Sequence, residues 1–261
     1  EGMDGRSFAG VLRGETAEHR ERIFTTHSGD GQWNIYPSRS VRDGRPGAVI
    51  KADYANTALE EFLAQPELGV DAVMLDAEQG TPDFERIEDM ARVARLAGLC
   101  VLVRVFSPEP WVMERMLLRG VDGVIVPRLD SAEQARAVVD IVRYVFPAGA
   151  DDRKLLVVQV ESAAAHADLD ALLAIPEIDV FFIGPVDLSR SMGHGGDYAP
   201  APVQEAIDDI LRRAGRAGRV AGTMVKPGDA QQWLDRGARF LYFHVNDWLR
   251  IGARSFPLPR T

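Results

Sequence analysis

The chain has 261 residues and a formal net charge of −9 at pH 7, because 39 acidic residues outnumber 30 Lys and Arg residues. This balance argues against a nucleic-acid-binding surface, which needs basic residues to neutralise phosphates. The single cysteine, Cys100, excludes an intramolecular disulfide and a cysteine-based metal cluster. No apolar run approaches the roughly 18 residues of a membrane span and no signal peptide is apparent, so we expect a cytoplasmic protein that does not enter membranes.

Residues 1–46 are rich in Gly, Arg and Ser, and we expect them to form an irregular N-terminal arm or cap. From residue 47 onward, short apolar runs alternate with amphipathic stretches. We predict strands over residues 47–52, 71–78, 100–105, 123–129, 154–161, 179–184, 219–225 and 240–246. The helices predicted between them include residues 83–97, 131–145 and 202–217, which carry apolar residues on one face.

The nearly continuous apolar character of the strands is typical of a parallel sheet that helices cover on both faces. Eight such strands can close into a barrel without leaving an edge. A doubly wound open sheet is the alternative, but no G-x-G-x-x-G motif follows the first strand. We therefore predict a single α/β catalytic domain, a (β/α)8 TIM barrel, over residues 47–261.

In a barrel of this type the active site lies at the carboxyl ends of the strands. Gln159 and Glu161 share one face of the fifth predicted strand because side chains alternate, and Asp187 follows the next strand. Two carboxylates from neighbouring strands can supply oxygen ligands to Mg²⁺ or Mn²⁺, so we predict a metal site at Glu161 and Asp187. The alternatives are a salt bridge from Glu161 to a strand-end arginine and a helix N-cap role for Asp187. The other polar residues at strand ends are Lys51, Asp76, Glu78, Gln79, Arg104, Arg128 and Lys226.

Arg104 ends the third predicted strand, and its guanidinium can hold a substrate carboxylate or oxyanion through two parallel hydrogen bonds. The alternative is a structural ion pair with Glu78 or Glu161. Lys51 and Lys226 raise a Schiff-base alternative, since an amine in an apolar barrel can have a lowered pKa. We favour the metal-dependent mechanism, because neither lysine belongs to a matching motif and the carboxylate pair already supplies an electrophile.

Four segments carry a resemblance to a known family, namely residues 75–79 (LDAEQ), 103–105 (VRV), 158–162 (VQVES) and 183–189 (IGPVDLS), and the glycine-rich residues 192–196 (MGHGG) that follow add to it. They resemble the HpcH/HpaI family, the class II, metal-dependent pyruvate aldolases typified by 4-hydroxy-2-oxoheptane-1,7-dioate aldolase and 2-dehydro-3-deoxyglucarate aldolase. The resemblance extends from about residue 47 to 250. It implies a (β/α)8 barrel that assembles as a homo-oligomer, a hexamer or a trimer.

The resemblance also implies roles for individual residues. Glu161 and Asp187 would hold a divalent ion, Mg²⁺ or Mn²⁺, which binds the carboxylate and keto oxygens of a 2-oxo acid. Arg104 would stabilise the enolate or aldol oxyanion, and Gln159 would contact pyruvate or the water shell of the ion. Backbone N–H groups at the start of the next helix would hold the pyruvate carboxylate. The residues that the resemblance assigns to substrate binding are Gln159, Gly184, Pro185 and Val186.

The chain departs from the family after the second strand. Family members read D-G-E-H there, and the His, oriented by the Asp, is the usual candidate for the general base. This chain reads Asp76-Ala77-Glu78-Gln79, and glutamine cannot exchange a proton near neutral pH. General acid–base catalysis contributes about 10² to 10⁴ in rate, so we expect slower aldol turnover. We assign Arg104, Asp76 and the substituted position Gln79 to the catalytic group, with Asp76 and Glu78 as alternative bases.

We therefore predict a metal-dependent carbon–carbon lyase of the aldehyde-lyase type. It would form or cleave aldol adducts of pyruvate or a related 2-oxo acid through a metal-stabilised enolate, because a divalent ion on the keto oxygen lowers the energy of the enolate. Two alternatives stay open: a citrate-synthase-like condensation of oxaloacetate with an acetyl thioester, and a non-catalytic barrel that binds a 2-oxo acid and a metal. The partner in each case is a small-molecule 2-oxo acid.

Overall fold

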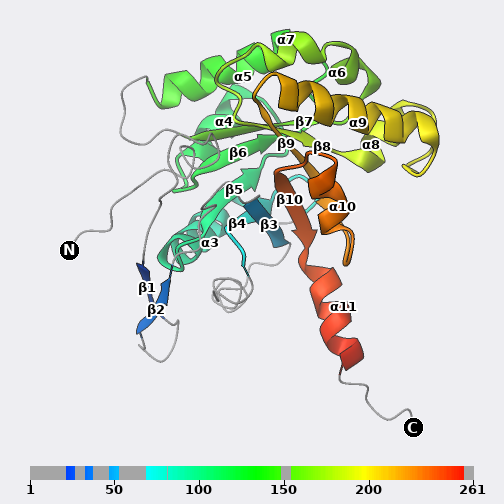
Figure 1. Cartoon of the computed structure of the whole chain (residues 1–261). Coiled ribbons are helices and arrows are strands. Elements are labelled where there is room, and N and C mark those ends of the chain that lie inside the picture. The colour runs from blue at the N-terminus through cyan, green and yellow to red at the C-terminus, as the bar shows by residue number, and fades with distance from the viewer. Residues whose placement is uncertain are drawn as a thin grey trace.

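The computed structural model describes residues 22–26, 33–37, 47–52, 69–80, 82–147 and 154–255. Eight parallel strands form a closed order, β10–β3–β4–β5–β6–β7–β8–β9, in which β10 pairs with both β3 and β9 (Figure 1). Each run that the sequence predicted as a strand contains one of them, so the predicted parallel α/β architecture is confirmed. The strands are β3 (Gly47–Ala52), β4 (Ala72–Asp76), β5 (Cys100–Arg104), β6 (Gly123–Val126), β7 (Leu155–Val160), β8 (Val180–Ile183), β9 (Val220–Val225) and β10 (Phe240–His244).

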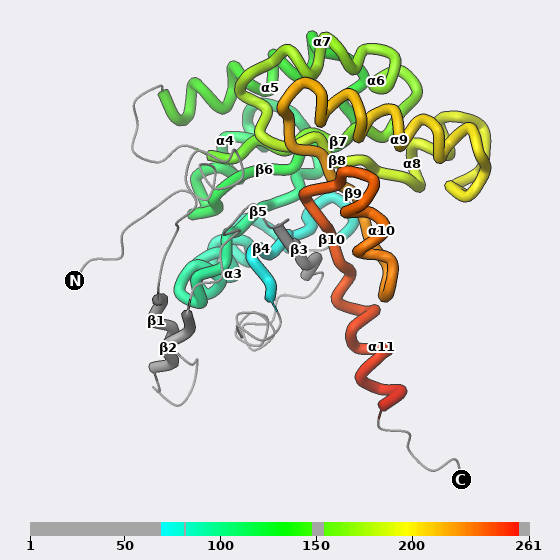
Figure 2. Tube along the Cα trace, in the orientation of Figure 1, coloured from blue at the N-terminus to red at the C-terminus, as the bar shows by residue number. Residues whose placement is uncertain are grey.

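Within the described residues, a helix follows each strand from β4 to β10, whereas residues 53–68 after β3 lie outside them. α5, α7 and α9 lie on one side of the strands, and α11 extends away from them beyond β10 (Figure 1 and Figure 2). No helix in this part of the chain is long and apolar enough to span a bilayer. The helices are α3 (Phe84–Leu96), α4 (Pro110–Leu117), α5 (Ala132–Val145), α6 (Ala163–Ala167), α7 (Leu169–Leu173), α8 (Pro185–Ser191), α9 (Ala201–Arg216), α10 (Ala230–Asp235) and α11 (Val245–Ser255).

Two further strands, β1 (Arg22–Thr26) and β2 (Trp33–Pro37), pair in an antiparallel two-stranded sheet. They fall within residues 1–46, where the sequence suggested irregular structure, so these two segments are regular. Aromatic and β-branched residues favour strands, and short runs of them (RIFTT and WNIYP) lie among the glycines and arginines that suggested an arm. The rest of residues 1–46 lies outside the described part of the chain.

Apolar side chains that alternate along the strands form two layers. One set, which includes Met74, Leu102 and Phe182, packs inside the barrel. The other, which includes Val103, packs against the helices. Phe182 meets the ring of Tyr242 edge to face, with the ring centres 5.8 Å apart. The interior is therefore a packed core rather than a pore, and polar side chains gather beyond its carboxyl end.

Gly222 in β9 marks the tightest approach between two strands. A Cβ atom at this position would lie 1.8 Å from the carbonyl oxygen of Phe240, a backbone atom that cannot move without opening the pairing of β9 and β10. We expect Gly222→Ala to lower the free energy of unfolding by about 3 kcal/mol, since overpacking costs about 1–3 kcal/mol and occasionally more. Urea denaturation measures this effect.

The matched control for this substitution is Gly215→Ala in the exposed last turn of α9, where a Cβ atom would meet nothing within 4 Å. Because alanine is the better helix former, the control is expected to gain about 0.5–1 kcal/mol. Equal unfolding midpoints for the two variants would contradict the packing argument.

Candidate active site

The polar residues singled out in the sequence meet at one end of the barrel. Asp76 is the last residue of β4 and Arg104 the last of β5, and the strand register pairs them directly. Gln159 and Glu161 lie at the end of β7, and Gly184 joins β8 to α8. Because all the strands are parallel, these positions share the carboxyl-end face.

Asp76 and Arg104 form a two-point ion pair. Asp76 is fully buried, and the guanidinium donates from Nε to Oδ1 at 2.8 Å and from Nη2 to Oδ2 at 2.6 Å. Burial opposes the charge of Arg104, but the hydrogen bond to Asp76 and the charges of Asp76 and Glu78 outweigh it and raise the pKa of Arg104. The guanidinium is therefore a permanent cation held in one orientation.

Asp76 also orders the turn that follows β4. Its Oδ1 accepts hydrogen bonds from the backbone N–H groups of Glu78 at 3.1 Å and Gln79 at 3.2 Å. Gly80 makes the tight turn feasible, since a Cβ atom there would lie 2.2 Å from the carbonyl oxygen of Asp76. Asp76 is thus arranged to orient Arg104 and the turn, and it leaves Gln79 exposed at the surface of the site.

Glu78 lies between two arginines. Its Oε2 is 3.1 Å from Nη1 of Arg104, and its Oε1 accepts a hydrogen bond from Nε of Arg128 at 3.0 Å. The Glu78 side chain is only 7% exposed, whereas that of Arg128 is 73% exposed. The pairing of Arg104 with Glu78 that the sequence left open is therefore present, together with the pairing to Asp76.

Arg128 follows β6 in a left-handed backbone conformation with a φ of 59°, and it is the only non-glycine residue with positive φ in the described part of the chain. This conformation costs a non-glycine residue about 1–2 kcal/mol. In this geometry the backbone N–H donates to Oε1 of Glu161 at 2.7 Å. Glu161 is therefore held by the main chain of residue 128, and among the described residues no arginine guanidinium forms the salt bridge with it that was the expected alternative.

Glu161 is almost completely buried among other carboxylates. Burial raises the pKa of Glu161, the hydrogen bond from the Arg128 N–H opposes the rise, and the negative charges of Glu78 and Asp187 add to it. A hydrogen bond from Gln159 also acts to lower it. The pKa of Glu161 is raised on balance, so its surroundings disfavour the ionised form.

Gln159 and Gly184 enclose the Glu161 carboxylate. Nε2 of Gln159 donates to Oε2 of Glu161 at 2.5 Å. The amide oxygen Oε1 of Gln159 is buried and has no hydrogen-bond partner among the described residues. A Cβ atom at Gly184 would lie 2.9 Å from Oε2 of Glu161, so only glycine leaves the carboxylate its space.

Asp187 lies in the first turn of α8 and is about half exposed, with Oδ1 accepting from Nη1 of Arg190 at 2.8 Å. The N-cap of α8 is Gly184, so the N-cap role considered for Asp187 is wrong. Pro185 is buried and Val186 half-buried at the start of the same helix. The first N–H groups of a helix have no partner within it, which leaves those of Val186 and Asp187 available to an anion.

These residues fit a divalent cation with oxygen ligands. Burial is the main cause of the raised pKa of Glu161, and a cation between Glu161 and Asp187 would offset both burial and the charge repulsion that adds to it. Gln159 adds a buried amide oxygen that lacks a partner in the described structure, and buried polar atoms are normally satisfied. No group of three or more His, Cys, Asp or Glu side chains among the described residues is arranged to hold a metal. The protein thus offers two carboxylates, and an octahedral Mg²⁺ would keep its other positions for substrate and water.

The Schiff-base alternative is disfavoured at Lys226. A side-chain hydrogen bond with Tyr198 and the charge interaction between them raise the pKa of Lys226. A nucleophilic lysine needs the opposite shift, because only the neutral amine attacks a carbonyl. The side chain of Lys51, the other lysine considered, lies outside the described part of the structure.

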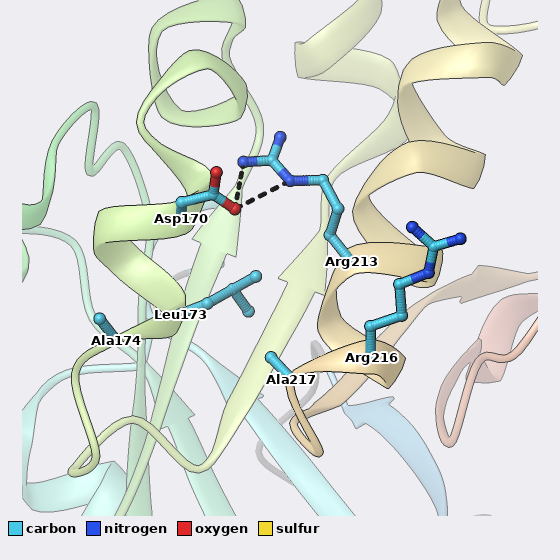
Figure 3. Close-up of a pocket in the computed structure, with 6 residues that line it drawn as sticks. All are labelled: Asp170, Leu173, Ala174, Arg213, Arg216 and Ala217. Atoms are coloured by element: carbon cyan, nitrogen blue, oxygen red, sulfur yellow. Dashed lines mark hydrogen bonds and ion pairs between the residues drawn. The ribbon is translucent and has the colours of Figure 1, made fainter.

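A cavity between α7 and α9 is separate from this site (Figure 3). The residues that line it come just before β8 and β9, so it lies toward the amino ends of the strands. Its Arg213 is paired with Asp170 at 2.6 Å. No residue predicted for the active site lines this cavity, whose lining residues are Asp170, Leu173, Ala174, Arg213, Arg216 and Ala217.

Two residues of the site have contacts that sequence reasoning missed. The sequence places Arg128 among the strand-end residues without a role. It offers Glu78 as an alternative base and as an ion-pair partner of Arg104, but not as a partner of Arg128. A left-handed backbone is expected of Gly, Asn or Asp rather than Arg, so no sequence signal marks position 128. Both residues lie at or near the carboxyl end of a predicted strand, which indicates the end of the barrel at which they lie but not their contact.

A fixed arginine beside a group of carboxylates, at the carboxyl ends of parallel strands, is typical of an enzyme site in an α/β barrel. The chain belongs to the HpcH/HpaI aldolase/citrate lyase family, whose family model matches residues 57–247. The resemblance inferred from the four sequence segments is thereby confirmed.

Three similar proteins illustrate the family. A hydroxypyruvate/pyruvate aldolase of Roseovarius nubinhibens is 33% identical over 213 residues, which cover 73% of this chain and 82% of the relative. A 4-hydroxy-2-oxovalerate aldolase of Rhodococcus jostii is 33% identical over 204 residues, 69% of this chain and 79% of the relative. The crystal structure of an HpcH/HpaI aldolase from Desulfitobacterium hafniense superposes with a TM-score of 0.71 at 26% identity, covering 83% of this chain and 95% of the other.

Proposed function

We propose that this protein is a divalent-metal-dependent aldolase, a carbon–carbon lyase that forms and cleaves aldol adducts of pyruvate or a related 2-oxo acid. The observation that carries the proposal is the presence, at one end of the barrel, of a buried Arg104–Asp76 pair and the mutually repelling carboxylates Glu161 and Asp187. The similar pyruvate and oxovalerate aldolases support pyruvate as the enolate-forming half.

The proposal extends to the scaffold. We propose a complete single-domain (β/α)8 TIM barrel over residues 47–261, which acts in the cytoplasm as a homo-oligomer and uses residues 1–46 as an arm. The closed strand order and the helices after seven of the strands support the barrel. The membership of the family supports an assembly of several copies.

Glu161 and Asp187 would hold the Mg²⁺ or Mn²⁺ ion. When bound, such an ion polarises the keto group of a 2-oxo acid as a Lewis acid. Gln159 orients the Glu161 carboxylate through its amide N–H, and Gly184 leaves the space that the carboxylate needs. The carboxylate is therefore fixed before substrate arrives.

Arg104 supplies donors to the oxygen that becomes negative as the carbon–carbon bond breaks. Asp76 and Glu78 engage three of the five guanidinium N–H groups, which leaves one on Nη1 and one on Nη2. Donors that are already fixed need no reorganisation when charge develops, which is why such groups lower the barrier. The pyruvate carboxylate would be held by the first N–H groups of α8, at Val186 and Asp187.

Proton transfer is the weak step of this site. Asp76 accepts four hydrogen bonds and Glu78 faces two guanidinium groups, so neither carboxylate is placed as a strong base. We expect Gln79→His to raise kcat for aldol cleavage by about 100-fold, the lower end of the range that general acid–base catalysis contributes. The gain should follow the titration of histidine between pH 5 and 8.

The control for this substitution is Gln79→Asn. Because asparagine, like glutamine, cannot exchange a proton near neutral pH, kcat should stay within about twofold of that of the original chain. A histidine variant no faster than the asparagine variant would mean that another group already supplies the base.

The proposed function is tested by following the exchange of pyruvate methyl protons for deuterium by NMR, with and without added Mg²⁺ or Mn²⁺. Metal-dependent exchange, together with pyruvate release from 4-hydroxy-2-oxo acids, is the expected result. Consumption of an acetyl thioester with oxaloacetate, without aldol cleavage, would favour the citrate-synthase-like alternative. No exchange at all would leave only the non-catalytic binding barrel.

A further inference from the structure

The contacts of Arg128 join the two halves of the site. Its backbone N–H holds Oε1 of Glu161 at 2.7 Å, and its side-chain Nε holds Oε1 of Glu78 at 3.0 Å. The other oxygen of Glu78 holds Nη1 of Arg104 at 3.1 Å. A continuous chain of polar contacts therefore runs from the Glu161 carboxylate to the Arg104 guanidinium.

We infer that Arg128 is a positioning residue that sets the Glu161 carboxylate through its main chain and the Arg104 guanidinium through Glu78. The inference rests on the proposed function, because that function gives Glu161 and Arg104 their roles. Arg128 itself touches neither the ion nor the substrate in this assignment.

The strained backbone explains why the side chain matters. A left-handed residue at position 128 is needed to aim the N–H at Glu161, and glycine would supply it without steric conflict. Arginine adopts the same conformation at a cost, and strain of this kind is typical of functional sites. Compared with glycine, arginine adds the contact between its guanidinium and Glu78, because this guanidinium has no other partner among the described residues.

Glu78 needs this second arginine to stay in place. Its side chain is 7% exposed, and Asp76 already takes two N–H groups of Arg104. Without Arg128, the contact to Nη1 of Arg104 is the one side-chain contact of the Glu78 carboxylate left among the described residues, and it alone opposes the repulsion from Glu161. If Glu78 is displaced, it no longer holds Nη1 of Arg104. One of the two guanidinium N–H groups assigned to the substrate oxygen is on Nη1, so this donor would lose its fixed position.

The test distinguishes the role of the Arg128 main chain from the role of its side chain. In Arg128→Gly the N–H to Glu161 is kept and the guanidinium is lost. We expect this variant to bind Mn²⁺ with an affinity within about threefold of that of the parent chain, and its unfolding temperature without metal to be unchanged or higher. Oxalate, an analogue of the enolate, should bind the Mn²⁺-loaded variant about 10-fold more weakly than it binds the Mn²⁺-loaded parent chain. The kcat for aldol cleavage should fall about 10-fold with KM little changed, and Arg128→Lys should recover most of both losses.

A double-mutant cycle tests whether Arg128 acts on Arg104 through Glu78. Glu78→Gln should weaken oxalate binding to the same extent, and Arg128→Gly combined with Glu78→Gln should be no worse than Glu78→Gln alone. Multiplicative losses, or oxalate affinity unchanged in Arg128→Gly, would overturn the inference. Oxalate binding needs no turnover, so an inactive parent chain that shows the expected oxalate pattern refutes the aldolase activity and leaves the positioning role intact.

Discussion

Glu161→Gln is expected to abolish Mn²⁺ binding and to lower aldol cleavage by about 10³-fold. The substitution keeps the shape of the side chain and removes one of the two charges that hold the cation, and with it the several kcal/mol that a Lewis acid contributes. Calorimetric titration with Mn²⁺ and an assay coupled to pyruvate release measure the two effects.

The same substitution should leave the metal-free protein at least as stable as before. Burial and the neighbouring carboxylates raise the pKa of Glu161, so the folded state disfavours its ionised form. The stability that the protonated group contributes is present below the ordinary carboxyl pKa and is lost as pH rises from there through the raised pKa of the folded state, so at neutral pH the ionised residue is destabilising. A glutamine escapes this cost, since a flipped Gln159 can accept from the new amide through the oxygen that lacks a partner in the described structure.

The matched control is Glu177→Gln, whose carboxylate bonds Arg143 just before β8, at the other end of the barrel. A surface ion pair contributes only about 0–1 kcal/mol, so Mn²⁺ binding and turnover should not change. If Glu161→Gln bound Mn²⁺ as tightly as this control, Glu161 would not be a ligand.

Replacement of Arg104 is expected to have the second-largest effect. Arg104→Lys should lower kcat by about 10²- to 10³-fold, the loss typical of removing an oxyanion donor, because one ammonium cannot hold both oxygens of Asp76 and also reach the substrate. Arg104→Met should destabilise the fold by about 3–5 kcal/mol as well, since it leaves the fully buried Asp76 without its countercharge. Steady-state kinetics and urea denaturation separate these losses.

Arg92→Lys serves as the control, because Arg92 is exposed on α3 and pairs only with exposed Glu88 and Asp89 among the described residues. Its kcat and unfolding free energy should match those of the parent chain within experimental error. If Arg104→Lys had the kcat of the parent chain, a positive charge at this position would suffice for catalysis, and the planar geometry of the guanidinium would have no role.

The fold was largely predictable because buried parallel strands leave a strong local signal. Apolar runs such as CVLVR and LLVVQV can satisfy their backbone groups and bury both faces only inside a helix-covered sheet. The strand ends were less certain, since predicted strand 71–78 continues two residues beyond β4 into the turn that Asp76 organises. The pairing of β1 with β2 escaped prediction because each run is only five residues long.

The site was predictable where residue alternation and strand order decide position, and not where backbone conformation decides it. Period-two alternation places Gln159 and Glu161 together, and the register of β4 and β5 places Asp76 beside Arg104. The left-handed conformation of Arg128 depends on a hydrogen bond to Glu161, 33 residues away in sequence. No local pattern encodes such a contact, which is why the link from Glu161 to Arg104 emerges only in three dimensions.

The most direct test of the account is the thermodynamic coupling between Mn²⁺ and oxalate. If Glu161 and Asp187 hold a cation that in turn binds a 2-oxo acid, oxalate should tighten Mn²⁺ binding at least about 10-fold, and Mn²⁺ should tighten oxalate by the same factor. This coupling should vanish in Glu161→Gln and in Asp187→Asn. Oxalate that binds equally well with and without Mn²⁺, or coupling that survives in both variants, would contradict the central claim.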